Sequence, residues 1–208
     1  MGSVAAGSQY LWFLSRGSGL VLLALFSIVV VLGVATRTGS TPPRWPRFAV
    51  AELHRTLSLF AVALLVLHVV TAILDPFVSI GWAATVLPFA SPSRTLAIGL
   101  GTLAVDLGGA VLVTSLLRQR LGQRTWRAVH WLAYLAWPAA FIHSLTAGND
   151  LGYWWVALVE VGSAAAVAAA VLARLFGRSR QDPGGPGPVS PGPGPARPVS
   201  ARSAAGAS

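Results

Sequence analysis

The chain has 208 residues, of which 54% are apolar and only 10% are charged, and its mean hydropathy is +0.67. A soluble domain carries about 25% charged residues, so this composition excludes an ordinary soluble protein and indicates an integral membrane protein surrounded by lipid. The net charge of +9 comes from arginines that cluster beside apolar runs, where they set membrane orientation, so we expect no nucleic-acid partner. The absence of cysteine excludes disulfides, thiol catalysis and cysteine-ligated iron–sulfur clusters.

Five apolar runs are long enough to cross a bilayer, which takes about 20 helical residues. The predicted fold is therefore all-α, an integral membrane helical bundle of about five transmembrane helices. The segment between the second and third runs contains three prolines, and we expect a short interfacial or re-entrant piece there rather than a sixth span. In chain order, the expected spans cover residues 11–35, 50–74, 95–117, 127–147 and 152–175.

The two ends of the chain differ from this pattern. Residues 177–208 are rich in Pro, Gly and Ser, which predicts a disordered cytoplasmic tail after a membrane domain that covers residues 10–176. At the start, a cleaved signal peptide is an alternative to a first span, because small residues at Gly33 and Ala35 follow an apolar stretch. The aromatic residues that precede Arg16 are unusual in a charged leader and favour the span.

The distribution of arginine predicts the orientation of the spans. Two loops and the C-terminal flank are rich in arginine, whereas the other two loops are near neutral or acidic. The positive-inside rule then places the N-terminus outside and the C-terminus in the cytoplasm, with Arg16 as an exception. A composition with arginine but no lysine, and much Ala and Gly, is typical of a high-GC bacterium, so we expect a multi-pass protein of the bacterial plasma membrane. The arginine-rich segments are 36–49, 118–127 and 174–180.

All four histidines lie in only two of the expected spans. His54 and His68 are fourteen residues apart in the second span, and His130 and His143 are thirteen apart in the fourth. One full hairpin separates these spans, so they run in the same direction, and the spacings correspond to roughly 21 and 19.5 Å of helix. We therefore expect His54 to lie opposite His130, and His68 opposite His143, at two matched depths.

Two facing imidazoles at one depth are what an axially ligated haem requires. Two such levels predict two haems stacked across the membrane, with the four histidines as the iron ligands. A zinc or proton-relay site is an alternative, although such sites need clustered ligands or carboxylate partners. Structural histidines are a further alternative, because a single buried histidine is usually a hydrogen-bonding group.

The direction of the side chains is a second test of this pairing. A step of fourteen residues at about 100° each returns to within roughly 40° of the starting face, whereas a step of thirteen misses it by roughly 140°. Pro138 lies between His130 and His143 and removes a backbone hydrogen bond. We predict a distortion at Pro138 that turns both imidazoles toward the second span, and a straight helix there would argue against the second haem.

The spacings H-x13-H and H-x12-H resemble the ferric reductase-like transmembrane domain family, and RTWRAVHWLAYLAW is similar to the start of that family's second histidine helix. The resemblance covers about residues 10–175. The family includes the membrane portions of NADPH oxidases and iron reductases, and the haem subunit of periplasmic methionine sulfoxide reductase. It implies two b-type haems with bis-histidine ligation that carry electrons across the bilayer, and hence an oxidoreductase subunit.

The chain departs from the oxidases and iron reductases of this family, which continue into a cytoplasmic flavin and nicotinamide domain. No GxGxxG motif follows a strand here, and no segment has room for a dinucleotide fold. We therefore expect a separate cytoplasmic reductase or a membrane quinol as the donor, with a quinone as a further candidate cofactor. The expected acceptor is ferric iron or a redox partner outside the membrane. A haem-free transporter or proton-conducting protein, and a purely structural subunit, remain alternatives.

Several charged residues near the histidines are candidates for supporting roles. Arg55 adjoins His54 and Arg127 precedes His130, so these arginines could bind haem propionates, with membrane anchoring as the alternative. Intramembrane acids are also functional candidates, through proton transfer from a quinol or by orienting a histidine, unless they are simply bonded to another helix. The remaining candidates are Arg124 on the inner side, Arg94 and Arg16 on the outer side, and the acids Asp106 and Glu160.

Overall fold

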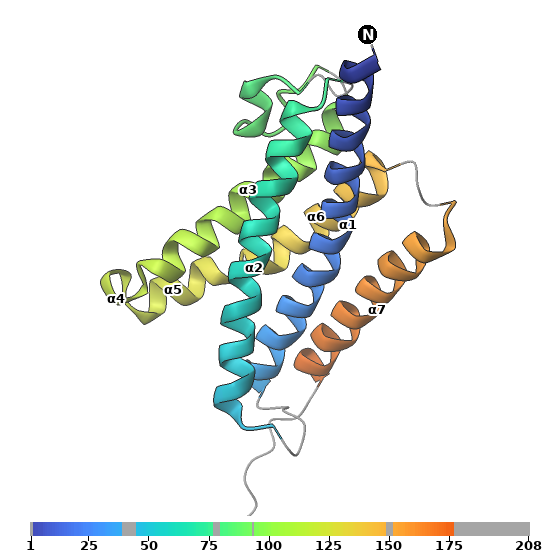
Figure 1. Cartoon of the computed structure of the whole chain (residues 1–208). Coiled ribbons are helices and arrows are strands. Elements are labelled where there is room, and N and C mark those ends of the chain that lie inside the picture. The colour runs from blue at the N-terminus through green and yellow to red at the C-terminus, as the bar shows by residue number, and fades with distance from the viewer. Residues whose placement is uncertain (1, 39–44, 77–79, 93, 149–151, 177–208) are drawn as a thin grey trace, which may run out of the picture. The chain divides into compact units, whose positions relative to one another are not determined.

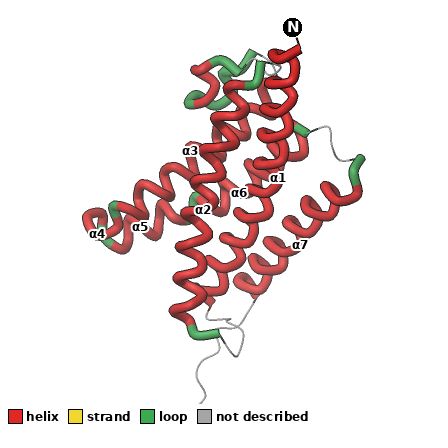
Figure 2. Tube along the Cα trace, viewed as in Figure 1, coloured by secondary structure: helices red, strands yellow, loops and turns green. Residues whose placement is uncertain are grey.

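The computed structural model describes residues 2–38, 45–76, 80–92, 94–148 and 152–176. All regular structure within these ranges is helical, which confirms the all-α prediction (Figures 1 and 2). The predicted disordered tail lies outside the described residues. In chain order, the elements are α1 (Gly2–Thr38), α2 (Arg47–Leu74), the 3₁₀ helix η1 (Trp82–Thr85), α3 (Thr95–Leu116), α4 (Arg118–Leu121), α5 (Gln123–His130), α6 (Ala133–Ala147) and α7 (Trp154–Phe176).

Helices α1, α2, α3 and α7 are each long and apolar enough to cross a membrane. Their outer surfaces carry large exposed apolar side chains, such as Phe60 at 63% and Leu158 at 64% exposure. Because a helix satisfies its own backbone hydrogen bonds, an apolar exterior of this kind suits contact with lipid. The fourth expected span, residues 127–147, is formed by α5 and α6 together. The chain is therefore a multi-pass helical membrane protein.

The fourth expected span is interrupted at residues 131–132, between α5 and α6, and not at Pro138. Helix α6 continues through Pro138 without a break, and the interruption that the structure shows lies at residues 131–132 instead. A proline removes one hydrogen bond, but neighbouring parts of a membrane helix can absorb that loss without ending the helix.

The interruption changes how tightly the chain winds. Its backbone bonds span three residues instead of four, from Leu132 to Val129 at 2.9 Å and from Tyr134 to Trp131 at 3.0 Å. Such 3₁₀ bonds turn the chain by about 120° per residue rather than 100°, so three residues recover roughly 60° of the roughly 140° mismatch. The tighter winding therefore helps the two histidines of this span to face the same way.

The helices pack so that a space remains between the two that carry histidines. Helix α2 packs mainly against α1, and α6 packs mainly against α3, while α1 also contacts α6 and α7. The buried side chains at these contacts are small, and they include Val29, Val30, Ala97, Ala136 and Ala139. Small side chains let neighbouring helices approach closely, which gives the bundle its contacts without filling the space between α2 and α6.

Among its described residues, the segment between α2 and α3 contains no helix long enough to cross a membrane, as predicted. Helix α2 ends at Leu74, because Pro76 keeps Asp75 extended, with φ −73° and ψ 113°. Further on, η1 is held against α3 by the Thr102 hydroxyl, which donates to the Ala84 carbonyl at 2.6 Å. Ala84 is only 2% exposed, so this short piece closes one end of the bundle.

Candidate functional site

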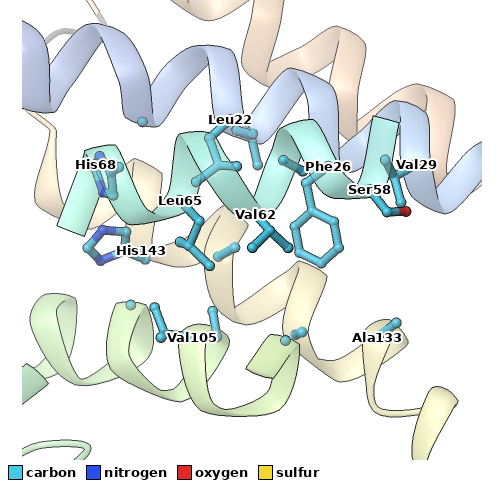
Figure 3. Close-up of a pocket in the computed structure, with 18 of the residues that line it drawn as sticks. Leu22, Phe26, Val29, Ser58, Val62, Leu65, His68, Val105, Ala133 and His143 are labelled. Carbon is cyan, nitrogen blue, oxygen red and sulfur yellow. The ribbon is translucent and has the colours of Figure 1, made fainter. Parts of the chain in front are cut away.

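The structure brings the four histidines together in two pairs, one pair at each of the two predicted levels. The ring centroids of His54 and His130, here called the His54 level, lie 6.4 Å apart. Those of His68 and His143, the His68 level, lie 6.3 Å apart, and Figure 3 shows these two rings facing one another from α2 and α6. Two imidazoles that bind one metal ion from opposite sides, with bonds of about 2 Å, place their ring centres roughly 6 Å apart. Both levels have the spacing of paired axial ligands.

Both levels line a single cavity of about 1740 Å³. A pocket for one drug-sized ligand has roughly 300–1,000 Å³, so this cavity has room for more than one such group. Its middle, between the two levels, is lined by apolar side chains of α1, α2 and α3, which are labelled in Figure 3. An apolar lining suits a large planar macrocycle and keeps water away from it. These side chains are Leu22, Phe26, Val62, Leu65 and Val105.

Three of the four imidazoles are oriented by a backbone carbonyl of a neighbouring helix. If Nδ1 carries the proton and donates it to that carbonyl, Nε2 is left as the metal-binding atom. This is the usual support of a metal-ligating histidine, because it fixes both the tautomer and the ring direction. The bonds join His54 Nδ1 to Val29 O at 3.0 Å, His68 Nδ1 to Ser15 O at 2.8 Å, and His143 Nδ1 to Ala97 O at 2.7 Å.

A glycine packs against each of these three imidazoles, four residues after the carbonyl that orients it. A Cβ at Gly19 would lie 2.8 Å from His68 Cε1, one at Gly33 3.2 Å from His54 Cε1, and one at Gly101 2.7 Å from His143 Cε1. A side chain at these positions would therefore push the ring away. These contacts were not predicted from the sequence. The available signal was that Gly19 and Gly33 are fourteen residues apart, as His54 and His68 are.

His130 is held differently from the other three histidines. Its Nδ1 is buried and has no hydrogen-bond partner within the described part of the chain. Its ring centroid lies 5.0 Å from that of Trp126, and the Trp126 indole Nε1 donates to Ser115 Oγ at 3.2 Å. The two histidines of the His54 level are therefore supported unequally.

The arginines near the His54 level have little holding them elsewhere. Arg55 and Arg127 both line the cavity, whereas Arg124 does not. Arg55 lies 3.7 Å from Glu52, but these side chains are 74% and 64% exposed, so the ion pair contributes little. Arg127 Nε donates to the Gln123 carbonyl at 3.3 Å on its own helix. Propionate binding by Arg55 and Arg127 stays a prediction.

Two arginines meet at the opposite end of the cavity. Arg94 and Arg16 both donate to the Ala147 carbonyl, at 2.8 and 3.4 Å. Ala147 ends α6 four residues after His143, so these two cations lie beside the His68 level. They are far apart in the sequence, and their contact with one carbonyl brings both to the same end of the cavity, while propionate binding by them stays a prediction.

The two intramembrane acids differ in position. Asp106 is exposed and is not among the residues that line the cavity, which leaves no support for a contact with a histidine. Glu160 is only 4% exposed, lines the cavity, and shares a hydrogen bond of 2.5 Å with the Ser144 hydroxyl beside His143. Of the two acids, Glu160 is the one that the fold brings toward the site.

The fold and this site define a class of protein, namely a multi-pass helical membrane protein with facing histidines at two depths of one apolar cavity. The sequence model of the ferric reductase like transmembrane component family matches residues 18–141, which is more than half of the chain, and the chain belongs to this family. The match contains three of the four histidines and ends two residues before His143. Members generally bind haem, and membership suggests a transmembrane redox role. No curated protein and no solved structure matches the chain.

Proposed function

We propose that this protein transfers electrons across a membrane through two b-type haems, each bound between two histidines. The observation that carries the proposal is the nearly equal spacing of the two imidazole pairs, 6.4 and 6.3 Å, on one cavity. Haem b, when bound, supplies reversible one-electron chemistry. His54 and His130 would ligate one haem, and His68 and His143 the other.

The residues of the chain then have three tasks. Two histidines at each level would hold the iron of one haem, which would leave no ligand site for oxygen or substrate and favours electron transfer over oxygen activation. The backbone carbonyls of α1 and α3 would orient the imidazoles, and the apolar cavity would exclude water. Arg55 and Arg127 at one end, with Arg94 and Arg16 at the other, would bind the propionates.

The direction of transfer follows from the predicted orientation. The positive-inside rule supports an N-terminus outside and a C-terminus in the cytoplasm, and the composition supports a bacterial plasma membrane. The His54 level then lies toward the cytoplasm. We propose that electrons arrive there from a separate reductase or a membrane quinol. They would leave at the His68 level, to ferric iron or a redox partner outside.

The haem-to-protein ratio of the purified protein tests this proposal. We expect two low-spin b haems per chain in a dithionite-reduced minus oxidised spectrum, because each imidazole pair has the spacing of axial ligands. One haem per chain would mean that only one level binds its cofactor. A folded preparation that binds none, although haem was supplied during expression, would contradict the proposal and favour the haem-free transporter.

Replacing Asp106 should have little effect on the haems. Asp106 is exposed and away from the cavity, so we expect Asp106→Asn to keep both haems and an unchanged rate of reduction by a quinol analogue. Glu160→Gln is the comparison, since Glu160 lines the cavity and is bonded to Ser144. Haem loss in the Asp106 variant but not in the Glu160 variant would reverse the roles assigned to the two acids.

A further inference from the structure

The three oriented histidines follow one rule along the helices that face them. In each case the carbonyl of one residue accepts the Nδ1 proton, and the residue four positions later is a glycine that lies against the ring. The glycine matters because it exposes the carbonyl one turn before it to a side chain from another helix. The carbonyl and glycine positions are Ser15 with Gly19, Val29 with Gly33, and Ala97 with Gly101.

For the fourth histidine, His130, the position at which this rule expects a glycine is a serine. The two sites on α1 are fourteen residues apart, and a step of fourteen along α3 from Ala97 and Gly101 reaches Val111 and Ser115. Both of these residues line the cavity, as His130 does, and so do Leu112 and Leu116 beside them, whereas Ala110 and Thr114 do not. Val111 and Ser115 therefore stand where a carbonyl and a glycine would serve His130.

The Ser115 side chain is hydrogen-bonded to the Val111 carbonyl, which is the carbonyl at the position expected to accept from His130. The Ser115 hydroxyl donates to Val111 O at 2.6 Å, and the Thr114 hydroxyl approaches the same oxygen at 3.2 Å. A carbonyl oxygen has two lone pairs, and one of them already accepts the helical N–H, so little capacity is left for an imidazole. Among the four histidine Nδ1 atoms, all in described residues, only that of His130 is buried without a hydrogen-bond partner.

The outer histidine of α2 shows that a hydroxyl bond alone does not have this effect. Ser18 Oγ donates to the Ser15 carbonyl at 3.1 Å, and the same carbonyl still lies 2.8 Å from His68 Nδ1. There the position against the ring is Gly19, which leaves room for the imidazole. Position 115 differs from the three glycine positions in two ways, because a serine there adds a Cβ and a hydroxyl that is bonded to Val111 O.

We propose that Ser115 makes the two haem levels unequal, by denying His130 the Nδ1 hydrogen bond that the other three ligands have. This inference rests on the proposed function. A hydrogen bond from Nδ1 strengthens the imidazole as a donor to the metal and fixes its direction. A weaker donor stabilises the oxidised iron less and raises its reduction potential, because hydrogen bonding around the ligands is one of the protein's means of setting that potential. The missing hydrogen bond therefore raises the reduction potential of the His54-level haem and weakens its binding, relative to the same level with two hydrogen-bonded histidines.

The substitution Ser115→Gly tests the inference directly, because it removes both the hydroxyl and the Cβ. In a reductive titration of the wild type, each haem gives one component with its own reduction potential. The component that disappears in the His130→Ala variant belongs to the His54 level. We expect Ser115→Gly to lower the potential of this component, to slow transfer of its haem to apomyoglobin about tenfold, and to leave the other component unchanged. Val113→Gly is the matched control, since Val113 lies on the same helix, is 53% exposed and is not on the cavity, so both components should stay as in the wild type.

The reciprocal substitution Gly101→Ser keeps the inference testable if Ser115→Gly does not fold. It places a serine against His143, so we expect the His68 level to lose its haem faster, and the fraction that keeps its haem to shift to higher potential. Two bound haems whose potentials and release rates do not respond to either substitution would overturn the inference while leaving the proposed function intact. A wild-type protein that binds no haem would overturn both.

Discussion

Replacing His143 by alanine should reduce the haem content from two per chain to one and stop electron transfer across the membrane. His143 faces His68 at 6.3 Å and is oriented by the Ala97 carbonyl at 2.7 Å, so its removal leaves the His68 level with a single ligand. The His54 level shares neither ligand nor carbonyl with it and should keep its haem. The haem-to-protein ratio and the rate at which vesicles containing dithionite reduce external ferricyanide measure the two effects.

The control for this prediction is Thr146→Ala. Thr146 lies on the same helix, three residues from His143, and its exposed hydroxyl bonds only to carbonyls of its own helix, at 2.7 and 3.3 Å. We expect this variant to keep both haems and the wild-type rate. If His143→Ala also kept two low-spin haems and full transfer, His143 would not be a ligand, and the pairing of the rings would have another origin.

The depth and partner of each histidine could be predicted because both follow from fixed helix geometry. The rise per residue is nearly constant, so fourteen residues on α2 and thirteen on α6 had to span similar distances, whatever the neighbouring helices were. The direction of the chain followed in the same way from the number of spans between the two. The structure accordingly pairs His54 with His130 and His68 with His143, while the role of these residues as haem ligands stays a prediction.

The supporting contacts could not be predicted, because they depend on how neighbouring helices slide and rotate against each other. In a soluble helix, the polar face marks the side that meets water and so fixes the rotation. In α2, both the lipid-facing and the cavity-facing sides are apolar, so hydropathy does not show which side faces α1. The carbonyl partners of His54 and His68 therefore could not be predicted, although the fourteen-residue spacing of Gly19 and Gly33 on α1 was consistent with them.

The place of the irregularity in the fourth span was missed for a related reason. Pro138 marked a site where a helix hydrogen bond is absent, but the winding changes at residues 131–132, where the sequence contains only Trp and Leu. What lies near residues 131–132 is a contact with a side chain that is distant in the sequence. Arg174 of α7 lies 4.3 Å from the Trp131 ring centroid and hydrogen-bonds to the Tyr134 hydroxyl. Tertiary contacts of this kind lie where the chain departs from a helix, and local sequence does not reveal them.

Replacing Gly101 by valine should remove the His68-level haem even though all four histidines remain. A Cβ at this position would lie 2.7 Å from both Cε1 and Nδ1 of His143, and the ring cannot retreat without breaking its 2.7 Å bond to the Ala97 carbonyl. The added methyl groups make the displacement larger. We expect one haem per chain, the same product as His143→Ala, as measured by the haem-to-protein ratio.

Haem loss in Gly101→Val, where His143 is still present, would show that the position of the ligand matters as well as its presence. The other two glycines provide a graded control. The Cβ distance to the facing ring is 2.7 Å at Gly101, 2.8 Å at Gly19 and 3.2 Å at Gly33, so alanine substitutions should cause haem loss in that order, with little loss at Gly33. Gly162→Val adds the same side chain on α7, where no atom lies within 4 Å, and should keep both haems. Equal haem content in all of these variants would mean that the glycines merely allow close packing. The graded loss would instead show that α1 and α3 hold the imidazoles in place from behind.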